Sequence, residues 1–380
     1  MPKIAIDYTP AYEQGGGIGR YVRDLVTALS LIDNQSDYRL FVSGASKNTL
    51  LDQVGHNFSW KPTRISPKWF ARLWHRLKIP LPVEQFTGRI DLYHATDFVL
   101  PPTLQSTKTL LTVHDLSFVR VPETASPSLK AYLDRVVPLS VKRADHILAD
   151  SQATKDDLME LYGVTPEKIT VLLTGVDKRF QPSNIGELTM RSKYALSDRP
   201  YLFTIGTVQP RKNYARIIHS LAKLRAEGHD LDLVIAGGRG WLEDPIYQAI
   251  QETQMMDYVK LIGFADDQDI PTLYTQAKCV VFPSLYEGFG YPVLEGMACG
   301  TPVVTSNVSS LPEVAGDAAL MVNPYDVDAI TNAIRSIITD SELRKTLTER
   351  GFEQIKQFTW EKSARQLHQI YTDLLTGNLN

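Results

Sequence analysis

Short hydrophobic runs rich in β-branched residues alternate with longer segments of helical periodicity along the whole chain. Most of these runs are continuously hydrophobic, which is typical of parallel strands that helices cover on both faces. The alternation therefore predicts doubly wound parallel sheets of the α/β class. The predicted strands are residues 3–7, 38–44, 110–114, 146–151 and 169–174, followed by 201–207, 231–237, 259–264, 279–284 and 302–306.

The two halves of the chain open in the same way, with a strand, a glycine-containing loop and a helix. Residues 180–199 between them are polar and include Pro182 and Gly186, which predicts an interdomain linker. We therefore expect two Rossmann-like domains, residues 1–182 and 183–359, that face a central cleft at the carboxyl ends of their strands. The helical pattern of residues 360–380 predicts a terminal helix that packs back on the first domain.

Composition narrows the class of protein. The chain has 380 residues, of which 43% are hydrophobic and 22% charged, so it can bury two ordinary cores. A net charge of −3 and a pI near 6.3 give no reason to expect nucleic acid as a partner. Cys279 and Cys299 form no metal-binding or disulfide pattern, and the sequence has no signal-peptide pattern and no apolar run long enough to span a membrane. These features predict a cytoplasmic protein.

A glycine-rich segment, residues 15–20, follows the first predicted strand and precedes a helix predicted at 21–29. The backbone at Gly16 and Gly17 can approach a phosphate closely, and Arg20 can add a charged contact. The segment departs from the dinucleotide-binding fingerprint, and no acidic residue follows at the expected distance. A flexible turn without a ligand is an equal alternative.

The most informative segment is 283–295, Pro-Ser-Leu-Tyr-Glu-Gly-Phe-Gly-Tyr-Pro-Val-Leu-Glu. A buried strand ends here, a Gly-x-Gly turn follows, and Pro292 suits the first turn of a helix. The N–H groups from Gly290 to Leu294 then predict a site for a diphosphate. Glu295, expected in the first helical turn, can hold a ribose diol, while Glu287 can reach a sugar from the other side of the turn. The alternative is two glutamates without a special function.

Segment 283–295 resembles the Glu-x7-Glu motif of the retaining GT-B glycosyltransferases of family 4, the glycosyl transferases group 1. Segments 206–213 and 297–304 also match the wording of that family, and the resemblance extends over essentially the whole chain. It implies a GT-B fold with an acceptor-side first domain, a donor-side second domain and a nucleoside diphosphate sugar as donor. The donor contacts that we expect are Gly16, Gly17, Thr207, Arg211, Lys212, Phe264, Phe289, Gly290, Tyr291, Val293, Leu294 and Glu295.

Three residues are expected to act on the reacting groups, namely His114, Lys212 and Glu287. Lys212 begins a helix after the first strand of the second domain, where its charge can stabilise a departing diphosphate, and the resemblance implies this role. Thr207 stands where many relatives carry arginine, so Arg211 could supply that phosphate contact. His114 ends a strand and can donate to a sugar hydroxyl or carry a proton. The alternatives are a solvated lysine and a packed histidine.

The acidic run from Asp266 to Asp269 contains an Asp-x-Asp sequence, which in other glycosyltransferase folds holds a metal. Here it precedes a helix predicted at 270–277, so helix capping explains it better, and we expect neither a metal nor another cofactor. Phe264, just before this run, is expected to border the base pocket, as similar proteins suggest.

The segment from Lys68 to Lys78 places Trp69, Leu73 and Trp74 among basic residues at helical spacing. Such a helix can contact anionic lipid at the inner membrane face and approach a lipid-linked acceptor. The alternative is that its apolar side packs on its own domain.

Together these features predict transfer of a hexose, with mannose or glucose favoured, from a GDP- or UDP-sugar to an acceptor hydroxyl with retention of configuration. A saccharide or lipid-linked acceptor of cell-surface polysaccharide or glycolipid assembly is expected. The rival hypotheses are a nucleotide-sugar epimerase of the same fold and a non-catalytic nucleotide-sugar binding protein. A dinucleotide-dependent dehydrogenase ranks below both.

Overall fold

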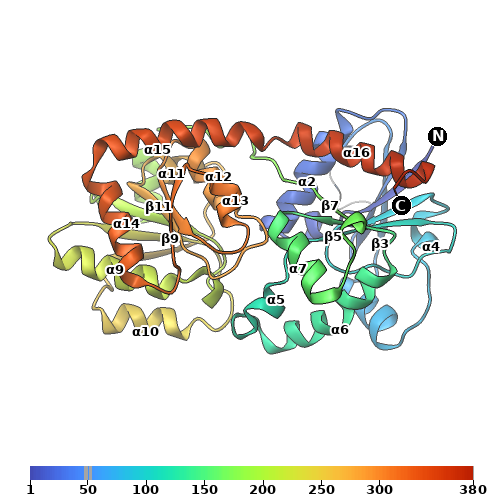
Figure 1. Cartoon of the computed structure of the whole chain (residues 1–380), viewed down its shortest axis with the longest axis horizontal. Coiled ribbons are helices and arrows are strands. Elements are labelled where there is room, and N and C mark those ends of the chain that lie inside the picture. Colours follow the sequence, from blue (N-terminus) through green and yellow to red (C-terminus); the bar gives the residue numbers. More distant parts are fainter. Residues whose placement is uncertain (47–49, 51–53, 380) are drawn as a thin grey trace. The chain divides into compact units, whose positions relative to one another are not determined.

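The computed structural model describes residues 1–46, 50 and 54–379. The chain folds into two compact units (Figure 1). Unit 1 comprises Met1–Leu116, Ala131–Gly175 and the segment that starts at Thr359, and unit 2 comprises Ser117–Lys130 and Val176–Phe358. The chain therefore passes from one unit to the other after Leu116, Lys130, Gly175 and Phe358.

Unit 1 is built on a seven-stranded sheet in which every pairing is parallel, in the order β3-β2-β1-β4-β5-β6-β7. Its strands are β1 (Lys3–Asp7), β2 (Asp37–Ser43), β3 (Phe58–Thr63), β4 (Leu92–Ala95), β5 (Lys108–Val113), β6 (His146–Ala149) and β7 (Ile169–Val171). The helices are α1 (Thr9–Glu13), α2 (Gly17–Ser30), α3 (Pro67–Phe70), the π-helical η2 (Ala71–Arg76), α4 (Glu84–Thr87), α6 (Pro127–Arg143), α7 (Gln152–Tyr162), η4 (Pro166–Lys168) and α16 (Trp360–Thr376). The first turn of α6, up to Lys130, belongs to unit 2.

Unit 2 is built on a six-stranded parallel sheet, in the order β10-β9-β8-β11-β12-β13. Its strands are β8 (Tyr201–Ile205), β9 (Asp232–Ala236), β10 (Val259–Gly263), β11 (Cys279–Phe282), β12 (Val303–Ser306) and β13 (Ala319–Val322). The helices are α5 (Ser117–Arg120), η3 (Pro122–Thr124), α8 (Glu187–Lys193), η5 (Pro210–Lys212), α9 (Tyr214–Ala226), α10 (Asp244–Glu252), α11 (Ile270–Thr275), α12 (Tyr291–Ala298), α13 (Leu311–Ala315), α14 (Val327–Thr339), α15 (Ser341–Gln354) and η6 (Ile355–Gln357).

The predicted α/β class with two parallel sheets is confirmed, and each of the predicted strands exists within a few residues of its expected bounds. Three strands were missed, namely β3, β4 and β13. β4 is only four residues long and contains a tyrosine and a histidine, so its hydrophobic run is too short to recognise. β3 is a half-exposed edge strand that carries Pro62, and proline is tolerated only at such edges.

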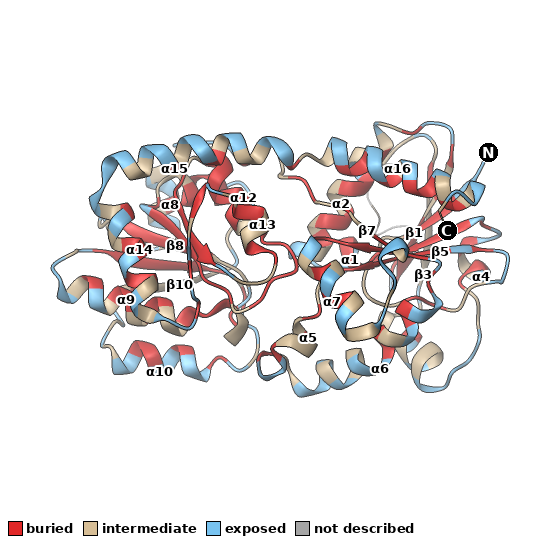
Figure 2. Ribbon diagram, viewed as in Figure 1, coloured by how far each residue is buried: buried red, intermediate tan, exposed pale blue. Residues whose placement is uncertain are grey.

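Apart from the edge strands, the strands of both sheets are largely buried, whereas the outer sides of the helices are exposed (Figure 2). In unit 2, Ile235 and Val281 belong to a core that they share with α9, α10 and α14. Val280, which points to the opposite face, packs on α12, where Gly296 leaves room for it. Period-2 alternation within continuously hydrophobic strands thus covers both faces of the sheet.

The last described helix, α16, belongs to unit 1 and packs along α2. The Tyr371 hydroxyl lies 2.7 Å from Nδ1 of His94 in β4, and the other ring nitrogen of His94 lies 2.9 Å from the Thr112 hydroxyl in β5. This buried polar chain joins the helix to the middle of the sheet. Residue 380, the last of the predicted terminal segment, lies outside the described residues.

The prediction of a linker at residues 180–199 was wrong. This segment is part of unit 2 and contains α8. It is attached to α11, because the Ser183 N–H donates to the Thr275 hydroxyl at 3.0 Å and the Thr272 hydroxyl donates to the Ile185 carbonyl at 3.0 Å. The polar composition reflects its position on the surface of unit 2.

The prediction that the glycine-rich segment 15–20 precedes its helix was also wrong in part. α1 follows β1 directly, and α2 begins at Gly17, so only Gly15 and Gly16 remain outside a helix. Gly19 lies inside α2. The position has no room for a side chain, because a Cβ there would lie 2.0 Å from the carbonyl oxygen of Gln14. This glycine therefore serves close packing of α2 against the end of α1.

Gly237 follows β9 with a φ of +143°, and a Cβ at this position would lie 2.0 Å from the carbonyl oxygen of Gly206. We expect Gly237→Ala to destabilise unit 2 by about 3 kcal/mol or more, because backbone strain and overpacking add. Gly228→Ala is the matched control, since Gly228 also has a positive φ but no atom within 4 Å of the added Cβ. Urea unfolding of both variants measures the difference, and equal losses would contradict the argument.

Candidate active site

The strand order of the unit 2 sheet reverses between β8 and β11: β9 and β10 are added on one side of β8, and β12 and β13 are added on the far side of β11. Ligands of such sheets bind beyond the carboxyl ends of the strands at this point. η5 follows β8 there, and the loop that carries Glu287 follows β11. Arg211, Lys212 and Glu287 therefore meet where the topology predicts a ligand.

These three side chains form a buried ion cluster, which we call the Glu287 cluster. The Lys212 Nζ donates to Oε1 of Glu287 at 2.6 Å, and the Arg211 Nη1 donates to Oε2 at 2.7 Å. Lys212 is 9% exposed and Glu287 is 7% exposed. Each carboxylate oxygen thus has its own cation. The sequence predicted these residues as separate contacts to diphosphate and sugar, whereas the structure joins them to each other.

Both cations shape the electrostatics of the cluster. Burial by itself raises the pKa of the Glu287 carboxyl, but the positive charges of Arg211 and Lys212 outweigh burial and lower this pKa to about 2. The Lys212 ammonium also lies over the Phe282 ring, 4.8 Å from its centroid. Glu287 is therefore a permanent anion and a weak base at neutral pH.

The backbone around the cluster is held by residues to which the sequence analysis assigned no role. Asn213 has a φ of +63°, which asparagine tolerates, and its side-chain amide donates to the carbonyl oxygens of Pro283 and Pro324. The Glu287 N–H donates to the Ser309 hydroxyl at 2.9 Å, and the Ser310 hydroxyl lies 2.9 Å from the Glu287 carbonyl oxygen. The signal for Asn213 was its place directly after the predicted basic pair.

Glu295 was predicted in the first turn of its helix, but it lies in the second turn, because α12 begins at Tyr291. Its Oε2 accepts a hydrogen bond from the Tyr274 hydroxyl at 2.7 Å, and the residue is 2% exposed. The dipole argument for Glu295 was therefore wrong, because a helix end acts within its first turn. Its role in binding ribose stays a prediction.

The set of amides at the start of α12 is smaller than predicted. Pro292 carries no N–H, and the Val293 N–H donates to the Gly290 carbonyl at 3.0 Å. The side chains of Phe289, Val293 and Leu294 are buried. A ligand at this helix would therefore meet backbone rather than these side chains.

Three loops converge at the carboxyl ends of β8, β9 and β10. The Val208 N–H donates to the Gly238 carbonyl at 3.0 Å, and the Gly237 N–H donates to the Gly263 carbonyl at 2.7 Å. Phe264 lies over Gly238, where an added Cβ would come within 2.3 Å of its ring, yet Phe264 is 84% exposed. Thr207 is exposed on the first of these loops. The glycine-rich run 237–240 was not predicted, although its position directly after a strand is a usable signal.

His114 follows β5 in unit 1, as predicted, but both of its ring nitrogens are engaged. Nδ1 lies 2.7 Å from Oδ2 of Asp150, and Nε2 lies 2.8 Å from the carbonyl oxygen of Thr96. Because both partners are acceptors, both nitrogens donate and the ring is an imidazolium. Burial by itself lowers the His114 pKa, but the charge of Asp150 and its hydrogen bond raise it to about 9. In this arrangement His114 holds its proton, so its predicted role as a proton carrier at neutral pH lacks a geometric basis.

The other predicted residues of unit 1 are Gly16 and Gly17, at the start of α2. Gly16 precedes the helix in an extended conformation, and a Cβ on Gly16 would meet no atom within 4 Å. The backbone there is open to an approaching ligand, as the prediction requires. Its phosphate contact stays a prediction.

The acidic run before α11 does not cap this helix, which corrects the prediction. Asp266 and Asp269 form ion pairs with Lys193, and Asp267 pairs with the Arg179 guanidinium at 2.8 Å. Asp269 makes no side-chain capping bond. These contacts tie α8 to the start of α11. Within the described ranges, no three His, Cys, Asp or Glu side chains gather as metal ligands would.

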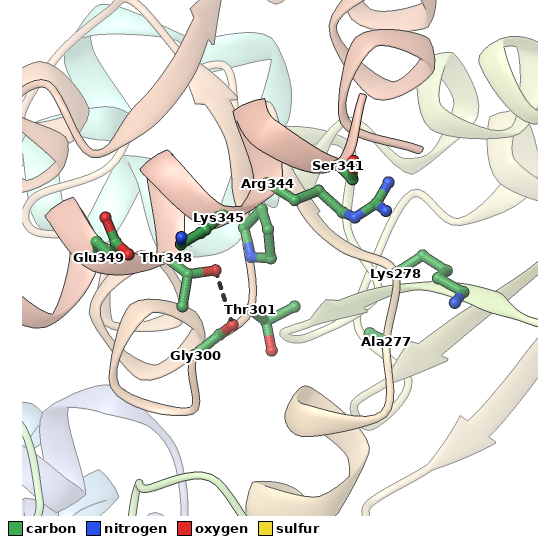
Figure 3. Close-up of a pocket in the computed structure, with 10 residues that line it drawn as sticks. Ala277, Lys278, Gly300, Thr301, Ser341, Arg344, Lys345, Thr348 and Glu349 are labelled. Carbon is green, nitrogen blue, oxygen red and sulfur yellow. Dashed lines mark hydrogen bonds between the residues drawn. The ribbon is translucent and has the colours of Figure 1, made fainter. Parts of the chain in front are cut away.

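A hollow in unit 2 lies away from this site (Figure 3). It is lined by residues that precede β11 and β12, such as Lys278 and Thr301, and by Arg344 and Thr348 of α15. These residues lie at the amino ends of the strands, opposite the edge where such sheets bind ligands. None of the predicted site residues lines it.

Comparisons with known proteins identify the family of this chain. Residues 187–354 match the family described as Glycosyl transferases group 1, and residues 15–180 match Glycosyltransferase Family 4. The chain is 33% identical over 368 residues to the O-antigen chain mannosyltransferase B of Escherichia coli, covering 93% of this chain and 95% of that protein. The chain belongs to the group 1 glycosyltransferases.

Solved structures support the fold of this glycosyltransferase. The sucrose-phosphate synthase of Thermosynechococcus elongatus superposes with a TM-score of 0.77 at 22% identity and covers 99% of this chain and 100% of its own. Anabaena HepE, solved in complex with UDP and glucose, has a TM-score of 0.73 at 19% identity, with 98% of this chain and 99% of that chain covered. The predicted GT-B fold is therefore confirmed.

The charged state of His114 makes the stability of the glycosyltransferase depend on pH. The folded protein holds this proton up to a pKa of about 9, whereas an unfolded histidine loses it near pH 6.5. The stabilisation is complete below pH 6.5 and is lost as the pH rises through 9, by about 3 kcal/mol in all. Denaturant unfolding at pH 6, 7.5 and 9 measures this loss. His114→Gln should abolish most of it, whereas His56→Gln, at an exposed position, should keep it.

Proposed function

We propose that the protein is a retaining glycosyltransferase that moves a hexose, with mannose favoured over glucose, from a GDP- or UDP-sugar to an acceptor hydroxyl. The observation that carries this proposal is the pair of cations, the partly buried Arg211 and the buried Lys212, at the switch point of the unit 2 sheet. Two cations at this edge suit a diphosphate leaving group. The name of the Escherichia coli relative supports mannose as the sugar and polysaccharide assembly as the process.

We assign the donor to unit 2 and the acceptor, a saccharide or a lipid-linked saccharide, to unit 1. Lys212 and Arg211 stabilise the diphosphate together with backbone at Gly290 and Tyr291, and Thr207 borders the same edge. Glu295 takes the ribose in exchange for its bond to Tyr274. The exposed ring of Phe264 offers a face on which the base stacks.

Residues of unit 1 contribute charge and backbone in this proposal. His114 presents a fixed positive charge to the donor sugar, and Gly16 and Gly17 add backbone N–H groups at the start of α2.

Retention is supported by the protonation states of the candidate residues. An inverting transferase needs a general base whose pKa lies near the working pH. Glu287 has a pKa of about 2, and His114 is an imidazolium with both nitrogens engaged. Neither is ready to accept the proton of the acceptor hydroxyl. In a same-face substitution the departing phosphate accepts it, and the protein supplies position and charge.

We propose that the reaction requires no metal and no other cofactor, because Arg211 and Lys212 already place two positive charges at the diphosphate. Activity retained after treatment with EDTA tests this part. The rival hypotheses are separated by incubation with labelled GDP-mannose, UDP-glucose and their relatives. A transferase releases nucleoside diphosphate and keeps the anomeric configuration in its product, seen by NMR. Epimer formation without transfer supports the epimerase, and binding without turnover supports the binding protein.

Lys212→Ala should lower kcat by about 100-fold, because the charge of the departing diphosphate is no longer balanced. Steady-state assays of nucleoside diphosphate release measure the effect. Lys223→Ala is the control, since Lys223 is a half-exposed residue of α9 that pairs with Asp328 on the surface. If the two variants had the same kcat, the assignment of Lys212 would be lost.

We further propose that the enzyme works in the cytoplasm and contacts the inner membrane surface through the segment from Lys68 to Lys78. Both cysteines are buried and free, which suits a reducing compartment. Phe70 of the segment is buried and stacks on Trp74 with centroids 4.1 Å apart, whereas Trp69 is 56% and Leu77 is 63% exposed. None of the described helices is both long and apolar enough to span a bilayer.

The exposed Lys68, Arg72 and Arg76 suit anionic headgroups around these two apolar side chains. We expect binding to vesicles that contain anionic lipid, with a severalfold loss in the variant Trp69→Ser/Leu77→Ser and a loss at high salt. Leu31→Ser removes an even more exposed apolar side chain, directly after α2, and is the control. Co-sedimentation measures the bound fraction, and equal binding of both variants would argue against the surface.

A further inference from the structure

Glu287 accepts hydrogen bonds from the same two cations, Arg211 and Lys212, that the proposed function assigns to the diphosphate of the sugar nucleotide. The carboxylate binds the Lys212 ammonium at 2.6 Å and the Arg211 guanidinium at 2.7 Å. A carboxylate and a diphosphate oxygen are chemically similar acceptors for these cations. Glu287 therefore stands in the place of a phosphate oxygen.

The surroundings keep this internal anion in place without a ligand. The Leu285 N–H donates to the Arg211 carbonyl at 2.9 Å, so the loop after β11 is joined to η5 by backbone as well as by charge. The hydroxyls of Ser309 and Ser310 hold the backbone at Glu287. Lys212 is buried and the side chain of Arg211 is only 15% exposed, so the two cations would be costly without an anion, and Glu287 removes that cost in the empty site.

We propose that Glu287 is an internal competitor of the donor diphosphate: it holds Arg211 and Lys212 in the empty enzyme and weakens nucleotide binding until the diphosphate takes over these cations. The inference rests on the proposed function and deepens it. Its consequence is that the product, a nucleoside diphosphate, leaves more easily, because Glu287 regains its partners when the nucleotide departs. When the donor is bound, the released carboxylate is available to the sugar hydroxyls.

The opposite effect is expected if Glu287 is only structural. Loss of a merely structural side chain would disorder Arg211 and Lys212 and weaken nucleotide binding. Loss of a competitor strengthens binding, because the two cations then meet the diphosphate without an opposing negative charge. The sign of the change therefore distinguishes the two roles.

The experiment is calorimetric titration of the full chain with GDP and with UDP, without sugar. We expect Glu287→Gln to lower the Kd of the preferred nucleotide about tenfold or more, which corresponds to ~1.4 kcal/mol, and to lower kcat at the same time. Glu287→Asp keeps the charge on a shorter side chain and should tighten binding less. It also serves as the test if Glu287→Gln fails to fold, which circular dichroism would show.

Glu227→Gln is the matched control. Glu227 binds Arg335 in unit 2 through both carboxylate oxygens, at 2.6 and 2.7 Å, so the same charge is lost from a similar pair on the surface. Its nucleotide affinity should equal that of the wild type. If the wild type binds a nucleotide and both Glu287 variants bind it equally well or more weakly, Glu287 is not a competitor of the diphosphate, and the proposed function remains intact. If the wild type bound neither nucleotide, the proposed function would fail and the inference with it.

Discussion

The contact between Glu287 and its two cations is the interaction on which the rest of the site depends. It links the loops that follow β8 and β11, the two strands between which the strand order of the unit 2 sheet reverses. Buried charges are stable only when they are paired and hydrogen-bonded. This requirement explains the supporting contacts of Asn213, Ser309 and Ser310, which hold the two loops in the register that the ion cluster needs.

Unit 1 also has a buried pair of opposite charges, His114 and Asp150, at the carboxyl ends of its strands. His114 joins the carboxyl ends of three neighbouring strands, because Thr96 follows β4, His114 follows β5 and Asp150 follows β6. The hydroxyl of Thr154, in the first turns of α7, donates to the His114 carbonyl at 3.2 Å. A single charged ring thus orders three loops, and its positive charge is a fixed property of the edge.

Close backbone approach is the second constraint on this edge of the unit 2 sheet. Gly206 and Gly237 come so near to each other that neither loop could keep its path with a larger residue at position 237. Gly238 leaves the space over which the Phe264 ring lies, and this ring is 84% exposed. In the proposed function this flat, exposed ring is the surface on which the nucleotide base stacks.

Hydrophobic runs and glycine positions are local signals, so they were enough to predict the α/β class, most strands and the residues that follow them. The sequence placed Arg211, Lys212 and Glu287 at strand ends for the same reason. The partners of these residues emerge only in the folded chain, since Lys212 and Glu287 are 75 residues apart in sequence.

The partners of His114 and Glu295, namely Asp150 and Tyr274, were equally out of reach of sequence patterns, because they lie 36 and 21 residues away. Pairing across such distances depends on strand order and register, which no local pattern encodes. The protonation states follow from the same contacts, since burial and the nearest charge set each pKa. Sequence thus determined which chemical groups are present at the edges of the sheets, and folding decided which of them hold one another.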